Sequence, residues 1–156
     1  MSTETTTTMT SAETTEQNAE IVRLITESGM NQGHTDLDHL FASDYQVHGA
    51  GLRLPPGPSG YYRAVGLWRT AFPDWHIDLE QLVAEGDFVA DRFHTTGTHQ
   101  GPLFGVAATG RRVEVHGTDM HRVVDGQVQE SWISDDVPRI IDQLGIGRLL
   151  AERGAA

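Results

Sequence analysis

The sequence contains neither cysteine nor lysine among its 156 residues. Without cysteine there is no disulfide, no thiolate nucleophile and no zinc–sulfur site. Without lysine, no side-chain amine is present to form a Schiff base with a carbonyl substrate. Any acid–base chemistry must therefore come from histidine, aspartate, glutamate or tyrosine.

Positive charge is also scarce, because eleven arginines face 22 acidic residues and the formal net charge is −11. Surfaces that bind nucleic acid or anionic membranes need clustered cations, which are absent here. No apolar run approaches the ~20 residues that span a bilayer, and the N-terminus lacks the pattern of a secretory signal. We expect a cytoplasmic protein with neither nucleic acid nor membrane as a partner.

The length and the hydrophobic content of 38% fit one globular domain. Residues 1–14 are rich in threonine and have little to bury, so they are predicted to be a disordered tail. Residues 15–156 are predicted to form the single domain. Apolar residues at helical spacing predict helices over 16–28, 36–42, 60–72, with Ser59 as a cap, and 137–144.

Alternating apolar and polar residues predict strands after the first helices. Because helices come first and strands follow in order, the pattern indicates an α+β fold in which a curved antiparallel sheet wraps the early helices. The segments 49–59 and 101–110 contain glycine and proline and are predicted to be loops that cover a pocket. The predicted strands cover 75–85, 88–99, 111–124 and 127–135.

The last two predicted strands meet at Asp125-Gly126, a strong hairpin signal. Every second side chain of a strand faces the same way, so Asp119 and His121 share the face of two valines on the first arm. This arrangement predicts an apolar pocket with ionisable groups at one end.

On the second arm, Trp132 shares a face with Asp136 if the strand runs that far. A shift of one residue in register would turn Asp135 inward instead. Asp-Asp-Val-Pro before a helix also has the pattern of an N-terminal cap, so either aspartate has a structural alternative.

Four short stretches resemble the SnoaL-like polyketide cyclases of the nuclear-transport-factor-2-like (NTF2-like) superfamily. They are Ala71-Phe72-Pro73-Asp74, Gly97-Thr98-His99 with Gly101, Thr109-Gly110-Arg111-Arg112, and Glu130-x-Trp132 with an acidic residue four positions after the tryptophan. The resemblance covers about residues 36–145. It implies a cone-shaped α+β barrel, a homo-oligomer (dimer or tetramer), an apolar pocket, and catalysis without metal or organic cofactor.

The resemblance also implies an activity, the closure of a ring in an anthracycline-type aromatic polyketide by intramolecular aldol condensation. Carried onto this chain, the catalytic aspartate of the family falls on Asp136 and the neighbouring histidine on His121. An apolar wall such as Trp132 would raise the pKa of the carboxyl toward neutrality.

Further residues are candidates for binding the polycyclic substrate. Each also has an ordinary alternative, because aromatic side chains on helices are often plain core and histidines or carboxylates are often structural or interface groups. These candidates are His48, Trp68, Phe104, Asp119 and Trp132.

Two other functions remain open on the same scaffold. One is a hydroxylase component that acts on an anthracycline-like substrate with dioxygen and a separate reductase. The other is a non-catalytic module for ligand binding or dimerisation. A metal site is not expected, because no pair of the eight histidines has the spacing of a helical zinc motif.

Overall fold

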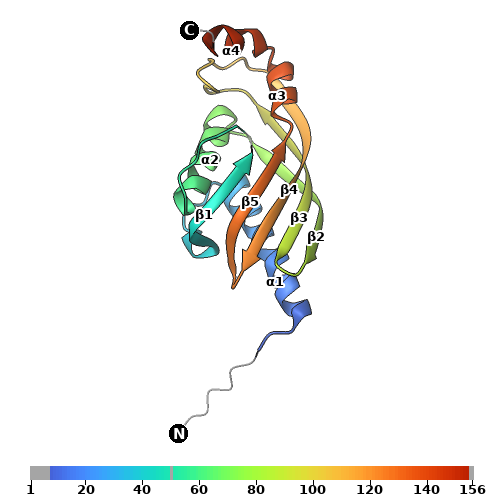
Figure 1. The fold of residues 1–156 in the computed structure, drawn as a ribbon. Coiled ribbons are helices and arrows are strands. Elements are labelled where there is room, and N and C mark those ends of the chain that lie inside the picture. The colour runs from blue at the N-terminus through green and yellow to red at the C-terminus, as the bar shows by residue number, and fades with distance from the viewer. Residues whose placement is uncertain (1–7, 50, 155–156) are drawn as a thin grey trace.

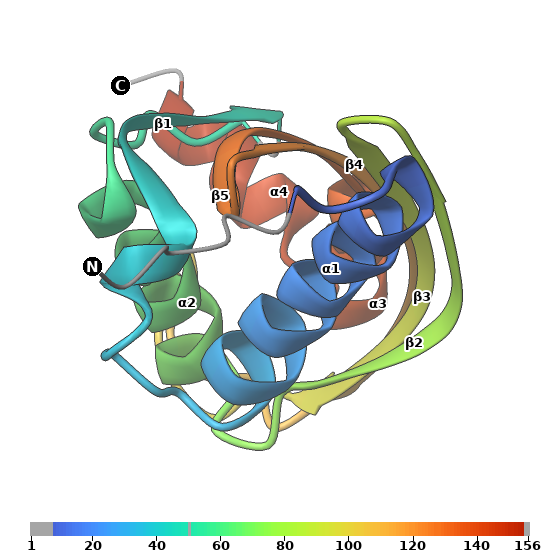
Figure 2. The same ribbon diagram turned by 90° about the horizontal axis from the view of Figure 1, so that it is seen from below.

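The computed structural model describes residues 8–49 and 51–154. A five-stranded sheet, in the order β1-β5-β4-β3-β2, curves around the helices α1 and α2, while α3 and α4 lie at one end (Figures 1 and 2). The strands are β1 (Phe41–Gly49), β2 (His76–Glu85), β3 (Phe88–Thr98), β4 (Arg112–Val124) and β5 (Gln127–Asp135). The helices are α1 (Ser11–Leu24), α2 (Pro58–Ala71), α3 (Val137–Leu144) and α4 (Gly147–Gly154), with a π-helical turn η1 (Ile25–Asn31) and a short 3-10 turn η2 (Asp38–Leu40).

Helix α1 begins earlier than its apolar spacing predicts. Thr10 caps it by accepting a hydrogen bond from the backbone N–H of Glu13, whose carboxylate in turn accepts from the N–H of Thr10. The prediction that residues 11–14 belong to a disordered tail is therefore wrong, because this capping box places them in the helix. The predicted tail residues 1–7 lie outside the described part of the chain.

Helix α2 starts at Pro58, one residue before the predicted cap. Gly57 precedes it and Pro58 occupies the first helical position, where its missing N–H costs nothing. Ser59 lies inside the first turn and bonds back to the carbonyl of Pro56, so it does not cap the helix. Tyr61 and Trp68 are buried on the face of α2 that lines the interior.

The sheet is mixed rather than wholly antiparallel. Strands β2 to β5 form the predicted antiparallel meander, and their predicted positions agree with the structure. Strand β1, however, pairs in parallel with β5, because the chain crosses over through α2 and the meander before β5 returns beside it. The prediction of an α+β fold with a curved sheet around the early helices is confirmed, with this correction to the strand directions.

The hairpin between β4 and β5 contains a feature that alternation alone does not reveal. Asp125 and Gly126 both have positive φ, 50° and 76°, which is typical of a type I′ turn. Two residues later the register shifts, since Val128 pairs with Val123 but Glu130 pairs with Arg122. Gln129 is left as a bulge, and beyond it the inward positions of β5 are Ser131, Ile133 and Asp135.

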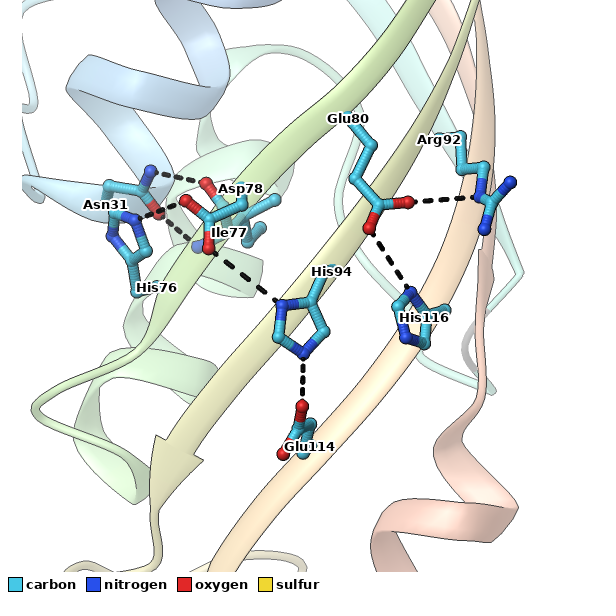
Figure 3. A network of polar contacts seen from close by, with 9 residues as sticks. All are labelled: Asn31, His76, Ile77, Asp78, Glu80, Arg92, His94, Glu114 and His116. Carbon is cyan, nitrogen blue, oxygen red and sulfur yellow. Dashed lines mark hydrogen bonds and ion pairs between the residues drawn. The ribbon is translucent and has the colours of Figure 1, made fainter.

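The outer face of the sheet carries a polar network across β2, β3 and β4 (Figure 3). His94 lies between Glu114, at 2.8 Å, and Asp78, at 4.0 Å, while Glu80 contacts Arg92 and His116. At the free edge of β2, the side-chain amide of Asn31 bonds both the N–H and the carbonyl of Ile77. Three of the eight histidines, at positions 76, 94 and 116, thus belong to a solvated face.

The C-terminal part forms two short helices. Helix α3 has the predicted bounds and buries Ile140 and Leu144, and it ends at Gly145 in the left-handed conformation. Helix α4 was not predicted and buries none of its residues. None of the helices in the described residues combines the length and the apolar character needed to cross a membrane.

Candidate active site

A pocket lies between the helices and the concave face of the sheet. The cavity has a volume of about 90 Å³, and the empty space is about 800 Å³ when the open mouth is included. Leu52 and Leu54, from the loop before α2, belong to its lining. A fused-ring ligand would therefore occupy the mouth as well as the interior. The walls are largely apolar and include Ile25, Met30, Val47, Tyr61, Trp68, Trp75, Ile77, Leu79, Phe93 and Ile133.

Three carboxyls and one imidazole interrupt the apolar lining, and all four groups come from adjacent strands. Asp91 on β3 stands directly opposite Asp119 on β4, and His121 lies two residues further along β4 on the same face. Asp135 joins them from the end of β5, where it pairs with Gly117. Asp91 and His121 are 4% and 5% exposed, so water reaches them only through the pocket.

Both ring nitrogens of His121 have partners. Its Nε2 lies 3.1 Å from Oδ2 of Asp91, and its Nδ1 lies 2.7 Å from Oγ of Ser131. The second carboxyl oxygen of Asp91, Oδ1, is buried and has no hydrogen-bond partner within the described residues. That oxygen keeps an unused capacity to accept a hydrogen bond.

Burial and mutual repulsion alter the acidity of the other two carboxyls. Loss of hydration raises the pKa of Asp135 to about 6, and the nearby charge of Asp91 adds to the effect. Burial also raises the pKa of Asp119, with further contributions from Asp135 and Asp91, although the N–H of Ser134 donates to Asp119 at 2.8 Å. Both groups therefore hold protons at pH values where an exposed aspartate has lost them.

Of the two predicted catalytic residues, His121 lies in the pocket and Asp136 does not. Asp136 is exposed and caps α3, accepting a hydrogen bond from the N–H of Arg139 at 3.1 Å. The bulge at Gln129 shifts the register of β5 by one residue, so Asp135 occupies the inward position instead. The placement of Asp136 as the inward carboxyl is corrected, in favour of the register alternative with Asp135.

Two of the predicted substrate-binding residues line the pocket and three do not. Asp119 and Trp68 line the pocket. His48 and Trp132 are not among its lining residues: their rings stack at 5.4 Å, and His48 bonds Glu130, the outward neighbour of inward Ser131. Phe104 also lies outside the lining and packs edge-on against Trp68 at 6.4 Å. The same bulge explains Trp132, since residues of β5 beyond Gln129 exchange faces.

Sequence reasoning missed Asp91 as a site residue. Its neighbour Arg92 points to the opposite face, as adjacent strand residues do. Arg92 indeed bonds Glu80 on the outer surface. The missed signal was position, because Asp91 falls between Val89 and Phe93 on the buried face of β3. A carboxyl at such a position needs a partner or a function.

One cluster of side chains has ligating atoms close enough together to coordinate a cation. The nearest ligating atoms of Asp91, Asp119 and His121 lie within 4.8 Å of one another. Asp91 and His121 already satisfy each other by a direct hydrogen bond, which fits a proton-transfer pair. The expectation that the site works without a metal stays a prediction.

Comparison with known proteins identifies the family of this chain. A profile of the SnoaL-like polyketide cyclases matches residues 19–144. The chain is 31% identical over 137 residues to the aklanonic acid methyl ester cyclase DnrD of Streptomyces peucetius, which covers 85% of this chain and 90% of that protein. It is 30% identical over 123 residues to the nogalonic acid methyl ester cyclase of Streptomyces nogalater, with 76% and 90% covered.

Solved structures agree with the assignment. TsrD from Streptomyces laurentii matches with a TM-score of 0.73 at 27% identity, over 83% of this chain and 96% of TsrD. The predicted family resemblance and fold are thereby confirmed. The chain belongs to the SnoaL-like polyketide cyclase family and has its NTF2-like α+β fold.

Proposed function

We propose that this protein is a cofactor-independent cyclase that closes a ring of an anthracycline-type aromatic polyketide by intramolecular aldol condensation. The observation that carries the proposal is the meeting, in one apolar pocket, of the Asp91–His121 pair with Asp135. Two relatives whose names state methyl ester cyclase activity support the reaction and the class of substrate. The proposal replaces the predicted Asp136 with Asp135 and keeps His121.

The base in this proposal is the carboxylate of Asp91. His121 holds its Oδ2, while Oδ1 is buried and unpartnered within the described residues. A carboxylate with one oxygen fixed and the other free can take a proton from a carbon that is flanked by carbonyl groups. His121 orients the base and stabilises its charge.

The acid is Asp135. Its pKa, raised to about 6, keeps a fraction of the carboxyl protonated near neutral pH. A substrate that expels water from the pocket would raise this pKa further, because the charged form loses its remaining hydration. The protonated carboxyl can then donate to the oxygen of the electrophilic carbonyl.

The reaction needs no other reagent. Asp91 removes a proton from the activated carbon, and the resulting enolate carbon attacks the carbonyl carbon within the same molecule. A carbon–carbon bond forms while the carbonyl π bond breaks, and its oxygen takes the proton of Asp135. Transfer of the proton from Asp91 back to Asp135, through the product or solvent, restores the enzyme.

The walls of the pocket suit a flat, uncharged substrate. The rings of Trp68 and Trp75 stack at 5.1 Å and an interplanar angle of 14°, and both residues line the pocket. No arginine lines it, whereas three carboxyls do. A substrate carboxylate would meet like charge there, so the neutral ester form of a polyketide acid fits better.

A direct assay tests the proposal. Purified protein is incubated with nogalonic acid methyl ester, and the cyclised product is followed by absorbance against buffer and against Asp91→Asn. Acceleration by the wild type, lost in the variant, supports the cyclase. Turnover that appears only with dioxygen and a reductase would instead indicate the hydroxylase, and binding without turnover would indicate the non-catalytic module. The predicted homo-oligomer remains a prediction that sedimentation analysis of the same sample would test.

A further inference from the structure

A continuous chain of hydrogen bonds runs along the wall of the pocket across four strands. The hydroxyl of Tyr45 on β1 donates to Oγ of Ser131 on β5 at 2.9 Å. Ser131 Oγ lies 2.7 Å from Nδ1 of His121 on β4, and Nε2 of His121 lies 3.1 Å from Asp91 on β3. All four residues are at least 95% buried, at 2%, 0%, 5% and 4% exposure.

The proton positions along this chain follow from what each group can donate. An ionised carboxylate only accepts, so the bond to Asp91 favours a proton on Nε2 of His121 without fixing it alone. In neutral imidazole the other nitrogen then accepts, and the hydroxyl of Ser131 is its donor. Ser131 in turn accepts from Tyr45. When each hydrogen bond is donated in the direction from Tyr45 toward Asp91, every group in the chain has a partner.

The reverse arrangement leaves a group unsatisfied. With a proton on Nδ1, the Ser131 hydroxyl would have to turn toward Tyr45, whose own proton would then lose its acceptor, since Ser131 is its one hydrogen-bond partner within the described residues. A buried donor without a partner is costly. Burial also raises the pKa of the Tyr45 hydroxyl, so Tyr45 keeps its proton and stays a donor.

We infer that Tyr45 and Ser131 are positioning residues that hold His121 as the tautomer with its proton on Nε2, and thereby keep Asp91 oriented as the base. This inference rests on the proposed function for its effect on turnover, but the tautomer itself does not depend on it. A nucleophilic role for Ser131 does not fit. Its side chain is wholly buried and it is not among the residues that line the pocket.

This chain of hydrogen bonds predicts that changes to Tyr45 or Ser131 affect kcat rather than KM. Ser131→Ala removes the donor to Nδ1, and Tyr45→Phe removes the hydroxyl that fixes the direction of Ser131. Because neither side chain carries the reacting carboxyl, the expected result is a fall in kcat of about 3- to 10-fold with KM nearly unchanged. Tyr62→Phe is the matched control, since its hydroxyl bonds Asp38 and Leu37 away from this chain.

The deciding measurement is the nitrogen NMR spectrum of His121 in the full-length protein, assigned by comparison with His121→Gln. The expected wild-type spectrum shows Nε2 protonated and Nδ1 unprotonated, with mixed tautomers in Ser131→Ala and Tyr45→Phe and no change in Tyr62→Phe. A wild-type proton on Nδ1, or an unchanged tautomer in both folded variants of Ser131 and Tyr45, would overturn the inference. Thermal unfolding identifies any variant that fails to fold, and Tyr45→Phe then serves alone. If the two variants shift the tautomer but the wild type shows no cyclase activity, the positioning role of Tyr45 and Ser131 is supported and the proposed cyclase function is rejected.

Discussion

Asp91 and Asp119 stand directly opposite each other on neighbouring strands, and both face the same apolar pocket. Opposed carboxylates on one sheet face repel each other, and Asp135 adds a third. The chain contains no lysine and no arginine lines the pocket, so neither type of cation neutralises the carboxylates there. Their negative charge is reduced by protonation instead. Loss of hydration, with this repulsion added to it, raises the pKa of Asp135 and so supplies a protonated acid near neutral pH.

Two neighbouring aspartates allow a matched pair of variants. Asp135→Asn should lower kcat by ~10²-fold or more, because the amide cannot supply the proton that Asp135 donates. Asp136→Asn should leave kcat unchanged, because Asp136 faces solvent and caps α3. Steady-state kinetics on nogalonic acid methyl ester measure both. The reverse result, with Asp136 essential and Asp135 dispensable, would restore the register that the sequence alone predicts.

The raised pKa of Asp135 predicts how stability changes with pH. Its folded pKa of about 6 exceeds the ordinary value of 3.8, so between these values the folded state holds more protons than the unfolded state. The free energy of unfolding therefore falls as pH rises through this window. Asp135→Asn removes that loss and should stabilise the protein above about pH 6, by about 1–3 kcal/mol relative to its effect near pH 4.

Urea unfolding of wild type and Asp135→Asn at both ends of this pH window measures the effect. Asp136→Asn serves as the control, and its effect should be small and the same at both pH values, because asparagine caps a helix about as well as aspartate. An identical stability difference between wild type and Asp135→Asn at the two pH values would show that the pKa of Asp135 is not raised by folding.

Two tryptophans, Trp68 on helix α2 inside the pocket and Trp132 on the outer side of β5, separate substrate binding from packing. Trp68→Phe should raise KM by about 3- to 10-fold, because the smaller ring removes part of the wall that stacks on a flat substrate. Trp132→Phe should leave KM unchanged, because Trp132 stacks on His48 outside the pocket lining. Equal changes in KM for the two variants, with both proteins folded, would contradict this assignment of the binding wall.

Gly117 tests the packing of the pocket wall. A Cβ added at this position would lie 2.3 Å from the ring of Phe93, a buried residue that lines the pocket. Gly117→Ala should therefore lower the free energy of unfolding by about 1–3 kcal/mol. Gly66→Ala on the exposed side of α2 meets no atom within 4 Å and should be neutral or stabilising, as alanine is in a helix. Thermal unfolding compares the two, and equal losses would refute the packing argument.

Much of this architecture could be predicted from local sequence patterns. The alternation of β4 placed Asp119 and His121 on one inward face, and Asp125-Gly126 predicted the turn, since both signals act over a few residues. The parallel pairing of β1 with β5 depends on a crossover between distant segments, which no local period encodes. Helix α4 buries no residue and so has no apolar stripe of the usual kind.

The candidate site was predictable only up to the bulge. Alternation along β5 is correct through Val128, but Gln129 inserts one residue and every later side chain changes face. For that reason Trp132 and Asp136 were expected inside, whereas Ile133 and Asp135 line the pocket. Such a bulge is fixed by pairing with β4 and not by the composition of the strand.

The position of a bound substrate would decide between the inner and outer faces of the sheet. A crystal structure of the protein with an ester analogue that cannot cyclise should show the polycycle against Trp68. Its acidic carbon should lie within about 3–3.5 Å of Asp91 Oδ1, the reach needed for proton transfer, and its carbonyl oxygen beside Asp135. A polycycle bound against Trp132 and His48, with the inner pocket empty, would contradict the proposed active site.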